Sequence, residues 1–600
     1  MHILRAGLRV SAILMVCSLA ATAAVSGEAV YAKRCAVCHE QINERIPSHA
    51  ALNMMPATRI LRALDFGAMM SIAYPMNREE REAVARFVGT AGGDAPPPAA
   101  AFCADRTVTL SDKAKFTWNG WSPNGDNTRF QPAAVAGLSV DQVKNLKLKW
   151  AFAFDGDVTA FAPPTFLDGQ IFVGSAGGLI HAMRAETGCL QWTYQATGPV
   201  RSAILTVPNG KLHTLLFGDQ TGWFYALEAE TGKLLWKKKI DDHDTARLTG
   251  APVAHDGVVY VPVASWEETR SSNPDYTCCT FRGSLVALQI RDGKQVWKSW
   301  MTDTPKESGK TESGKIKMGP SGASIWASPA LDIKRKLIYV TTGDNFSIPA
   351  TLTSDALVAI EMATGKIAWS KQVTEGDISP SEKGPDFDFG SSAMMIKTAA
   401  GRELLVAGQK SGIVYAFDPE KKGEIVWQVR VGKGGSNGGV QWGTASDGQN
   451  VYAAVSDRGM TRGTGPEGQP IRKLDPSAGG GLTALHIADG SKAWYVPAGA
   501  CTTPGCSPAQ SAALTAIPGA VFSGSLDGHI RAYAPEDGKI LWDFDTVKDF
   551  KTVNGAKGKG GALDGAGPVI VNGMVFVNSG YPRFGGLPGN VLLAFTPDGK

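Results

Sequence analysis

Short apolar runs separated by polar, glycine-containing turns dominate this chain from about residue 116 to its end. One unit recurs there: an apolar strand containing alanine, a polar turn with glycine, and then a tryptophan. In six of seven units the alanine precedes the tryptophan by ten residues, and the Ala/Gly/Trp sets are Ala182/Gly188/Trp192, Ala226/Gly232/Trp236, Ala287/Gly293/Trp297, Ala359/Gly365/Trp369, Ala416/Gly423/Trp427, Ala484/Gly490/Trp494 and Ala532/Gly538/Trp542. This regularity predicts an all-β repeat protein in which each unit is one antiparallel sheet.

An eighth unit begins at 591–595, and the chain stops at Lys600 before any tryptophan. The strand that would complete it lies at the other end of the repeats, in 146–150. Successive tryptophans are 42 residues (Trp150 to Trp192) to 72 residues (Trp297 to Trp369) apart, enough for four strands and a variable loop. Because pairing of the first strand with the last removes an open sheet edge, we predict an eight-bladed β-propeller over residues 116–600. The tryptophans are expected to be contacts between blades.

The N-terminal residues have the pattern of a secretory signal peptide, which we place at 1–26. Arg5 and Arg9 form a basic region, 10–21 is an apolar stretch too short to span a bilayer, and small residues follow. The sequence contains no other candidate membrane span. We therefore expect export to the periplasm and a soluble mature chain.

Residues 35–39 read Cys-Ala-Val-Cys-His, the attachment motif of c-type haem. Cysteines three positions apart lie on one face of a helix, where each forms a thioether to the haem, and His39 ligates the iron. A zinc site would need a second ligand pair, and a thioredoxin-like site would need a βαβ context; neither is found nearby. We predict a small all-α cytochrome c domain over 27–91, joined to the propeller by a Pro/Ala-rich linker at 92–115.

The second axial ligand of the haem is expected to be a methionine. Several methionines compete, and Met69 is favoured because it precedes the predicted final helix, which is capped by Asn77 with Glu80 three residues on. Met70 is the alternative.

Composition excludes some partners. Lys and Arg number 60 and Asp and Glu 56, a formal charge of +4 with no run of like charge. This near balance gives no reason to expect a nucleic acid or an anionic membrane as partner.

The Ala…Gly-Lys-x-x-Trp repeat resembles the tryptophan docking motif of eight-bladed, pyrroloquinoline quinone (PQQ)-dependent quinohaemoprotein dehydrogenases. The segments Trp-Asn-Gly-Trp at 118–121, Asn-Thr-Arg-Phe-Gln at 127–131 and Cys-Cys-Thr-Phe-Arg-Gly at 278–283, and the order of domains, are similar to the polyvinyl alcohol dehydrogenase branch. The resemblance covers nearly the whole mature chain. It implies PQQ, one covalent haem c and Ca²⁺ as cofactors.

The resemblance also implies site residues. Asp388, in Asp-Phe-Asp-Phe-Gly at 386–390, would be the catalytic base. Glu267, with Glu268 as second choice, and Asp344, with Asn345 as fallback, would bind Ca²⁺ through hard oxygens. The positions implied for PQQ are Arg201, Thr249, Ser324, Trp326 and Lys410, with Trp326 as the floor under the ring and Trp442 as a further wall.

Eight of the nine cysteines remain after removal of the signal peptide, and Cys35 and Cys38 hold the haem. The resemblance suggests a disulfide between the adjacent Cys278 and Cys279, although in relatives the vicinal pair belongs to an earlier blade. Cys501 with Cys506, and Cys103 with Cys189, are further candidate pairs; six cysteines allow 15 connectivities.

The sequence thus predicts an alcohol dehydrogenase that oxidises secondary or primary alcohol groups, those of polyvinyl alcohol first among them. It would pass electrons from PQQ to haem c and on to an external acceptor, such as a cytochrome c or a respiratory-chain component. Another alcohol, a sugar or an aldehyde is the alternative substrate. A non-catalytic propeller scaffold, or a degenerate dehydrogenase that only relays electrons, is the alternative function.

Overall fold

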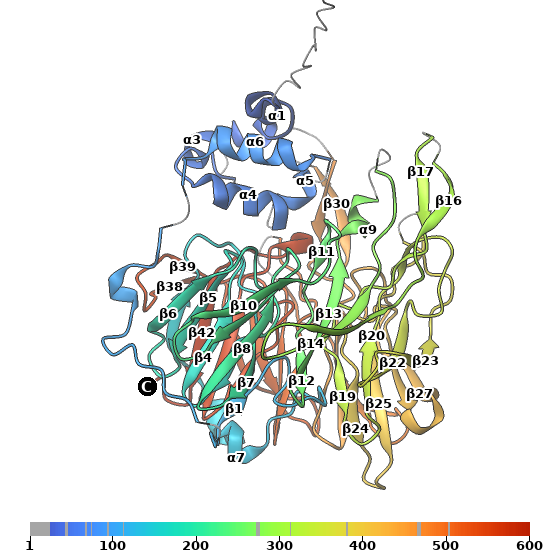
Figure 1. Cartoon of the computed structure of the whole chain (residues 1–600). Coiled ribbons are helices and arrows are strands. Elements are labelled where there is room, and N and C mark those ends of the chain that lie inside the picture. Colours follow the sequence, from blue (N-terminus) through green and yellow to red (C-terminus); the bar gives the residue numbers. More distant parts are fainter. Residues whose placement is uncertain are drawn as a thin grey trace, which may run out of the picture. The chain divides into compact units, whose positions relative to one another are not determined.

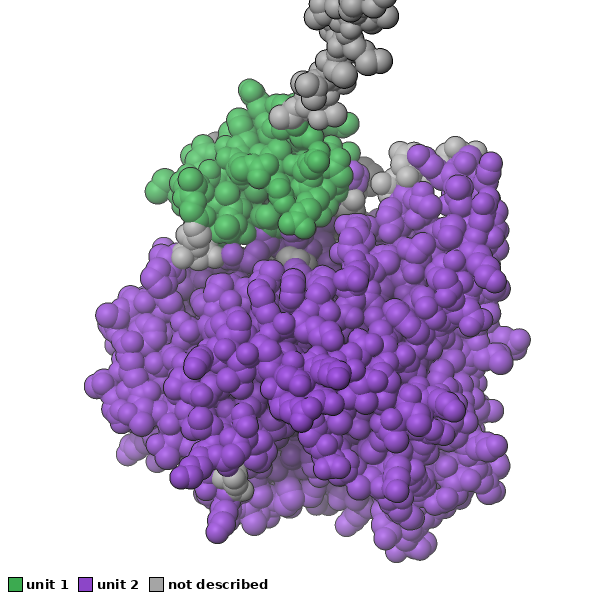
Figure 2. Space-filling model, viewed as in Figure 1, with its two compact units in different colours: residues 1–61, 76–92 green, residues 62–75, 93–600 purple. Residues whose placement is uncertain are grey.

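The computed structural model of the chain is a helical N-terminal part followed by a large β structure (Figure 1). It describes residues 25–41, 46–66, 69–73, 75–92, 95–111, 113–271, 276–311, 314–379, 382–464, 470–501 and 505–600. The chain divides into two compact units, 1–61 with 76–92 and 62–75 with 93–600 (Figure 2). The predicted signal peptide lies outside the described residues except for its last two positions. Within the described residues, no helix is long and apolar enough to cross a membrane.

The first unit is entirely helical in its described part. Its helices are α1 (Gly27–Arg34), α2 (Ala36–His39), α3 (His49–Leu52) and α6 (Arg78–Val88), while α4 (Ala57–Phe66) runs across the division and α5 (Met70–Ala73) falls in the second unit. Asn77 caps α6 with the predicted capping box: its side chain accepts from Glu80 N at 2.9 Å, and Glu80 accepts from Asn77 N at 2.8 Å.

The second unit contains eight four-stranded antiparallel blades. The first four consist of β3 (Thr165–Leu167), β4 (Gln170–Gly174), β5 (Leu179–Arg184) and β6 (Leu190–Gln195); β7 (Leu205–Asn209), β8 (Leu212–Gly218), β9 (Trp223–Glu228) and β10 (Leu234–Lys239); β12 (Val253–His255), β13 (Val258–Ser265), β14 (Ser284–Gln289) and β15 (Gln295–Trp300); and β19 (Ala330–Asp332), β20 (Leu337–Thr341), β22 (Ala356–Glu361) and β23 (Ile367–Gln372).

The last four blades follow the same plan. They consist of β24 (Met394–Lys397), β25 (Glu403–Gly408), β26 (Ile413–Asp418) and β27 (Glu424–Arg430); β28 (Ala445–Ser446), β29 (Asn450–Val455), β32 (Gly481–His486) and β33 (Lys492–Val496); β34 (Thr515–Ile517), β35 (Ala520–Gly524), β36 (His529–Tyr533) and β37 (Ile540–Asp545); and β40 (Val569–Val571), β41 (Met574–Ser579), β42 (Val591–Thr596) and β2 (Lys147–Ala153).

The last blade confirms the predicted closure of the ring. Strand β2, from the start of the repeats, pairs with β42, from their end, and Trp150 lies opposite Ala594. The eight-bladed propeller predicted from the sequence is therefore correct.

The tryptophans connect neighbouring blades, as predicted. In each set the alanine and tryptophan are cross-strand partners, for example Ala182 and Trp192. The indole N–H of Trp192 donates to the Ala229 carbonyl of the next blade at 3.0 Å, and the same contact recurs at Trp150, Trp236, Trp297, Trp427, Trp494 and Trp542. Gly232 has φ +74°, and a Cβ there would lie 2.6 Å from the Trp192 ring. The glycine of the motif is needed for both reasons.

Short strands and helical turns lie outside the four-stranded blades. They are β1 (Thr117–Trp118), β11 (Ala246–Arg247), the pairs β16 (Lys306–Lys310) with β17 (Ile316–Gly319), β18 (Ser321–Gly322) with β21 (Asn345–Ser347), β30 (Met460–Thr464) with β31 (Pro470–Leu474) and β38 (Asp549–Phe550) with β39 (Gly558–Lys559), and the helical turns η1 (Ala99–Ala101), α7 (Ala133–Ala136), α8 (Val140–Lys144), α9 (Glu267–Arg270), η2 (Pro419–Lys421) and η3 (Arg583–Gly585). In Figure 1, α9 and the β16–β17 hairpin lie at one end of the blades.

Three disulfides are present, and they match the three candidate pairs. Cys103 is bonded to Cys189, Cys278 to Cys279 and Cys501 to Cys506. Cys35 and Cys38 are free.

Candidate functional site

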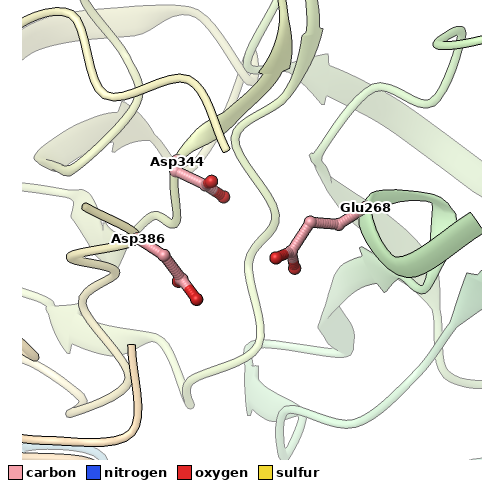
Figure 3. A group of neighbouring side chains, drawn as sticks. All are labelled: Glu268, Asp344 and Asp386. Atoms are coloured by element: carbon pink, nitrogen blue, oxygen red, sulfur yellow. The ribbon is translucent and has the colours of Figure 1, made fainter. Parts of the chain in front are cut away.

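Three carboxylates from different elements meet at one end of the propeller (Figure 3). Glu268 is in α9, Asp344 follows β20, and Asp386 lies in the segment before β24. Each residue contributes one carboxylate oxygen, and these three oxygens all lie within 4.8 Å of one another. We call Glu268, Asp344 and Asp386 the acidic cluster. Carboxylate oxygens at this spacing are suited to a hard cation such as Ca²⁺.

The acidic cluster is electrostatically unfavourable by itself. Burial, with the charges of Asp388 and Glu268, raises the pKa of Asp344 well above its usual range. Burial also raises the pKa of Glu268, and the charges of Asp386 and Asp388 add to the effect. One buried oxygen of Asp344, Oδ2, has no hydrogen-bond partner among the described residues. A bound cation would satisfy this oxygen and offset the repulsion, so the residues fit a metal site.

Lys410 connects the acidic cluster to Asp388. Its Nζ lies 2.7 Å from Asp386 Oδ1 and 2.7 Å from Asp388 Oδ2. Burial lowers the pKa of Lys410, but the charges of Asp386 and Asp388 outweigh it and the net shift is well upward. Burial raises the pKa of Asp386 to about 7, although the charge of Lys410 opposes this shift. Lys410 therefore stays protonated between the two aspartates.

The position of Asp388 is fixed by backbone as well as by Lys410. Its Oδ1 accepts a hydrogen bond from Asp344 N at 2.7 Å. A Cβ on Gly343 would lie 2.4 Å from the same oxygen, so only glycine allows this approach. Asp388 is buried, with 6% of its surface exposed. Its Oδ1 contacts the backbone of Asp344, a residue of the acidic cluster, and its Oδ2 contacts Lys410.

A cavity with aromatic walls is the second part of the site. Its walls include Trp326 and Trp442, whose rings are 5.3 Å apart and nearly perpendicular. The Arg201 guanidinium lies 4.3 Å from the Trp442 ring centre, and Lys410 Nζ lies 5.6 Å from that of Trp326. Thr249 also lines the cavity. A flat, anionic cofactor fits such walls because the rings offer stacking surfaces and Arg201 a charge-assisted hydrogen bond.

Most residues predicted for the site lie in this region. Asp388 and Lys410 join its two parts, Asp344 is in the acidic cluster, and Trp326, Arg201, Thr249 and Trp442 line the cavity. Ser324 is buried, and its carbonyl accepts from Gly343 N at 2.9 Å.

Glu267 differs from the expectation. Its carboxylate turns away from the acidic cluster and accepts hydrogen bonds from Thr280 N and Phe281 N, and Glu268, the second choice, takes the predicted position. Asn345, the fallback for Asp344, uses its side chain to bond Ser321 O and Thr351 N. Glu267 and Glu268 are adjacent residues of α9 and so point in different directions. The contacts of Glu267 with Thr280 and Phe281 decide which of the two faces the acidic cluster.

Asp386 was not predicted from the sequence. The signal that could have found it is its place two residues before Asp388 in the same loop segment, where a second carboxylate is available to the site. Its backbone is held by Asp377, whose carboxylate accepts from Asp386 N at 3.2 Å and Phe387 N at 2.8 Å.

In the Cys-Ala-Val-Cys-His motif of the first unit, one ring nitrogen of His39 is available for a ligand. His39 is buried in α2, and its Nδ1 lies 2.7 Å from the Pro47 carbonyl oxygen. Donation by Nδ1 leaves Nε2 with a free lone pair, as a metal-ligating imidazole requires. Met69 is half-buried and its N donates to Ala63 O at 3.1 Å. The pairing of His39 with Met69, or with Met70, stays a prediction.

Comparison with known proteins agrees with the fold. Residues 118–434 match the family model "Glucose/ethanol/alcohol dehydrogenase, beta-propeller domain", and residues 435–595 match "Outer membrane protein assembly factor BamB". The match of residues 118–434 covers more than half of the chain and places the protein in the quinoprotein dehydrogenase class. The chain belongs to the family of PQQ-dependent dehydrogenases.

Individual relatives narrow the class to alcohol oxidoreductases. The chain is 37% identical to a polyvinylalcohol dehydrogenase of Pseudomonas sp, covering 96% of this chain and 94% of the relative, and 37% identical to that of Sphingopyxis sp. (strain 113P3), covering 96% and 93%. Among solved structures, quinohemoprotein alcohol dehydrogenase ADHIIG from Pseudomonas putida HK5 has a TM-score of 0.62 at 19% identity, covering 83% of each chain. This protein is therefore an alcohol oxidoreductase.

Proposed function

We propose that this chain is a periplasmic quinohaemoprotein that oxidises secondary or primary alcohol groups, with polyvinyl alcohol as its substrate. The observation that carries the proposal is the contact of Lys410 with both Asp386 and Asp388, because it joins a candidate metal site to a candidate base beside an aromatic cavity. The 37% identity to two polyvinylalcohol dehydrogenases supports the polymeric substrate. The N-terminal sequence pattern supports export.

Two cofactors would occupy the site in the propeller. Glu268, Asp344 and Asp386 would hold Ca²⁺ through their oxygens. Trp326 would contact one face of PQQ, Trp442 would be a further wall of the cavity, and Arg201 and Thr249 would bind its carboxylates. When bound, PQQ supplies the acceptor for two electrons and the metal supplies Lewis acidity.

Asp388 is suited to accept the proton of the substrate hydroxyl. A general base has to be held in a fixed position, and Asp388 Oδ2 accepts a hydrogen bond from Lys410 Nζ at 2.7 Å. The Asp344 N–H, also at 2.7 Å, holds its second oxygen in place. Burial of Asp388 keeps water away from its carboxyl group and strengthens the hydrogen bonds with Lys410 and Asp344 N.

Cys35, Cys38 and His39 would bind haem c and give the chain a one-electron carrier. The free thiols of Cys35 and Cys38 and the orientation of His39 support this role. Met69, or Met70, would be the second ligand. Electrons would then leave through an external acceptor, such as a cytochrome c or a respiratory-chain component.

The test is turnover of the purified chain, loaded with PQQ and Ca²⁺, on a panel of substrates with dye reduction as the readout. We expect oxidation of polyvinyl alcohol and of a short secondary diol such as 2,4-pentanediol. Oxidation of an aldehyde or a sugar alone would contradict the substrate assignment. Failure to bind PQQ would contradict the proposed function altogether.

A further inference from the structure

The carboxylate of Glu267 is completely buried and saturated with hydrogen bonds, although it lies outside the acidic cluster. It accepts from Thr280 N at 2.8 Å, from Phe281 N at 2.7 Å and from the Tyr276 hydroxyl at 3.0 Å. His243 Nε2 lies 3.4 Å from the same carboxylate. A buried carboxylate with this many donors has a fixed position, because loss of any one contact leaves a buried polar group unpaired.

These donors lie on both sides of the Cys278–Cys279 disulfide. Tyr276 precedes the two cysteines, and Thr280 and Phe281 follow them. The other side of the same segment is held by β17, because Cys279 N donates to Met318 O at 3.0 Å and Met318 N donates to Cys278 O at 2.6 Å. The disulfide segment is therefore fastened between Glu267 and the β16–β17 hairpin.

Glu267 is also the first residue of α9, and the next residue is Glu268 of the acidic cluster. A helix of four residues has little stability of its own, so its orientation depends on tertiary contacts such as those of Glu267. The backbone N–H of Glu267 is bonded to Ser265 Oγ at 2.9 Å, which fixes the start of the turn. The direction in which Glu268 points is thus tied to the contacts of its neighbour.

We propose that Glu267 is a positioning residue that couples the Cys278–Cys279 segment to the metal ligand Glu268. The proposal rests on the proposed function, since it takes the acidic cluster to be a cation site. In this view Glu267 does not contact the ion. It sets the affinity of the acidic cluster for a cation by holding α9, and the disulfide contributes by ordering the donors that Glu267 needs.

The first test is calcium affinity of the full chain without PQQ, measured by calorimetry with CaCl₂. Glu267→Gln places an amide N–H₂ against the N–H groups of Thr280 and Phe281, so α9 should lose its fixed orientation. We expect the calcium affinity to fall about 10- to 100-fold, the range for loss of the outer contacts that orient a metal ligand. Calcium affinity equal to that of the wild type in a folded Glu267→Gln variant would overturn the proposal. No calcium binding by the wild type would instead contradict the metal site itself.

A matched control separates positioning from general destabilisation. Glu230, in another blade, accepts from His213 N at 3.1 Å and lies 3.0 Å from His213 Nδ1, with 12% of its side chain exposed. Glu230→Gln should lower the melting temperature and leave calcium affinity unchanged. If Glu267→Gln does not fold, Tyr276→Phe removes a single donor, and we expect a loss of a few-fold in affinity; an unchanged affinity there would overturn the proposal.

The coupling to the disulfide is tested by a double-mutant cycle. Replacement of both cysteines by serine should weaken calcium binding in the wild-type background. In the Glu267→Gln background the same replacement should have little further effect, because the connection is already broken. Equal effects of the replacement in both backgrounds would overturn the proposed coupling.

Discussion

Asp388 is the residue on which the proposed chemistry depends. Asp388→Asn keeps the shape of the side chain but removes the base, so we expect alcohol oxidation to fall by about 10²- to 10⁴-fold. Dye reduction measures the loss, and the haem absorption spectrum should stay that of the wild type. Asp537→Asn, which alters an exposed carboxylate paired with Lys539, is the control. Activity retained in Asp388→Asn would remove Asp388 from the reaction.

His529 provides a pH-dependent prediction away from the site. Its Nδ1 lies 2.6 Å from Asp543 Oδ1, and this hydrogen bond raises the pKa of His529 above its usual value. A histidine whose pKa is raised in the folded state stabilises that state. The stabilisation is fully present below the pKa of the unfolded state, about 6.5, and is lost as the pH rises through the pKa of the folded state.

His529→Gln should therefore lower the melting temperature more at about pH 5.5 than at about pH 8.5. The pair is partly exposed, so the effect should stay below about 1 kcal/mol. Thermal unfolding followed by circular dichroism at the two pH values measures it. A loss that is the same at both values would contradict the role given to His529.

Single residues also show where sequence reasoning reaches its limit. The family resemblance implied Asp344, Asp388 and Lys410, which lie together at the site. It favoured Glu267 over Glu268, because two adjacent glutamates differ only in the direction that α9 gives them. That direction depends on Ser265, which is close in sequence, and on Thr280 and Phe281, which lie well beyond α9 along the chain. It therefore depends on tertiary structure.

Neighbouring blades contact each other through the tryptophan of one blade and the glycine of the next. Gly365 has φ +72°, and a Cβ there would lie 2.6 Å from the Trp297 ring. Gly365→Ala therefore combines backbone strain with a clash, and we expect a loss of about 1–3 kcal/mol in unfolding free energy. Gly210, with φ +67° and open space around it, is the control for strain alone.

Denaturant unfolding of both variants tests the contact. Gly365→Ala should be clearly less stable than Gly210→Ala, because only the former meets a neighbouring ring. Equal losses would mean that the tryptophan does not restrict the glycine position. The repeat could be predicted from the sequence because the alanine and tryptophan of each unit pair across two strands of one blade, which fixes their spacing. The β16–β17 and β30–β31 hairpins escaped prediction because they lie in the variable loops between repeats.

The ring of blades is completed by segments from opposite ends of the propeller sequence. β42 lies between β2 and β41, so its removal would leave two strands of the last blade without their partner. Deletion of residues 591–600 should therefore abolish soluble, folded protein. Deletion of residues 598–600, which follow the strand, should be tolerated. Soluble yield and far-ultraviolet circular dichroism distinguish the two, and a folded 591–600 deletion would contradict the closure.

The most direct test of the whole account is a crystal structure of the chain grown with PQQ and Ca²⁺. We predict one calcium ion bound by carboxylate oxygens of Glu268, Asp344 and Asp386, at the usual distances of about 2.3–2.6 Å, with PQQ in the aromatic cavity against the face of Trp326. A structure in which the ion binds elsewhere, or in which the aromatic cavity holds no PQQ, would contradict it.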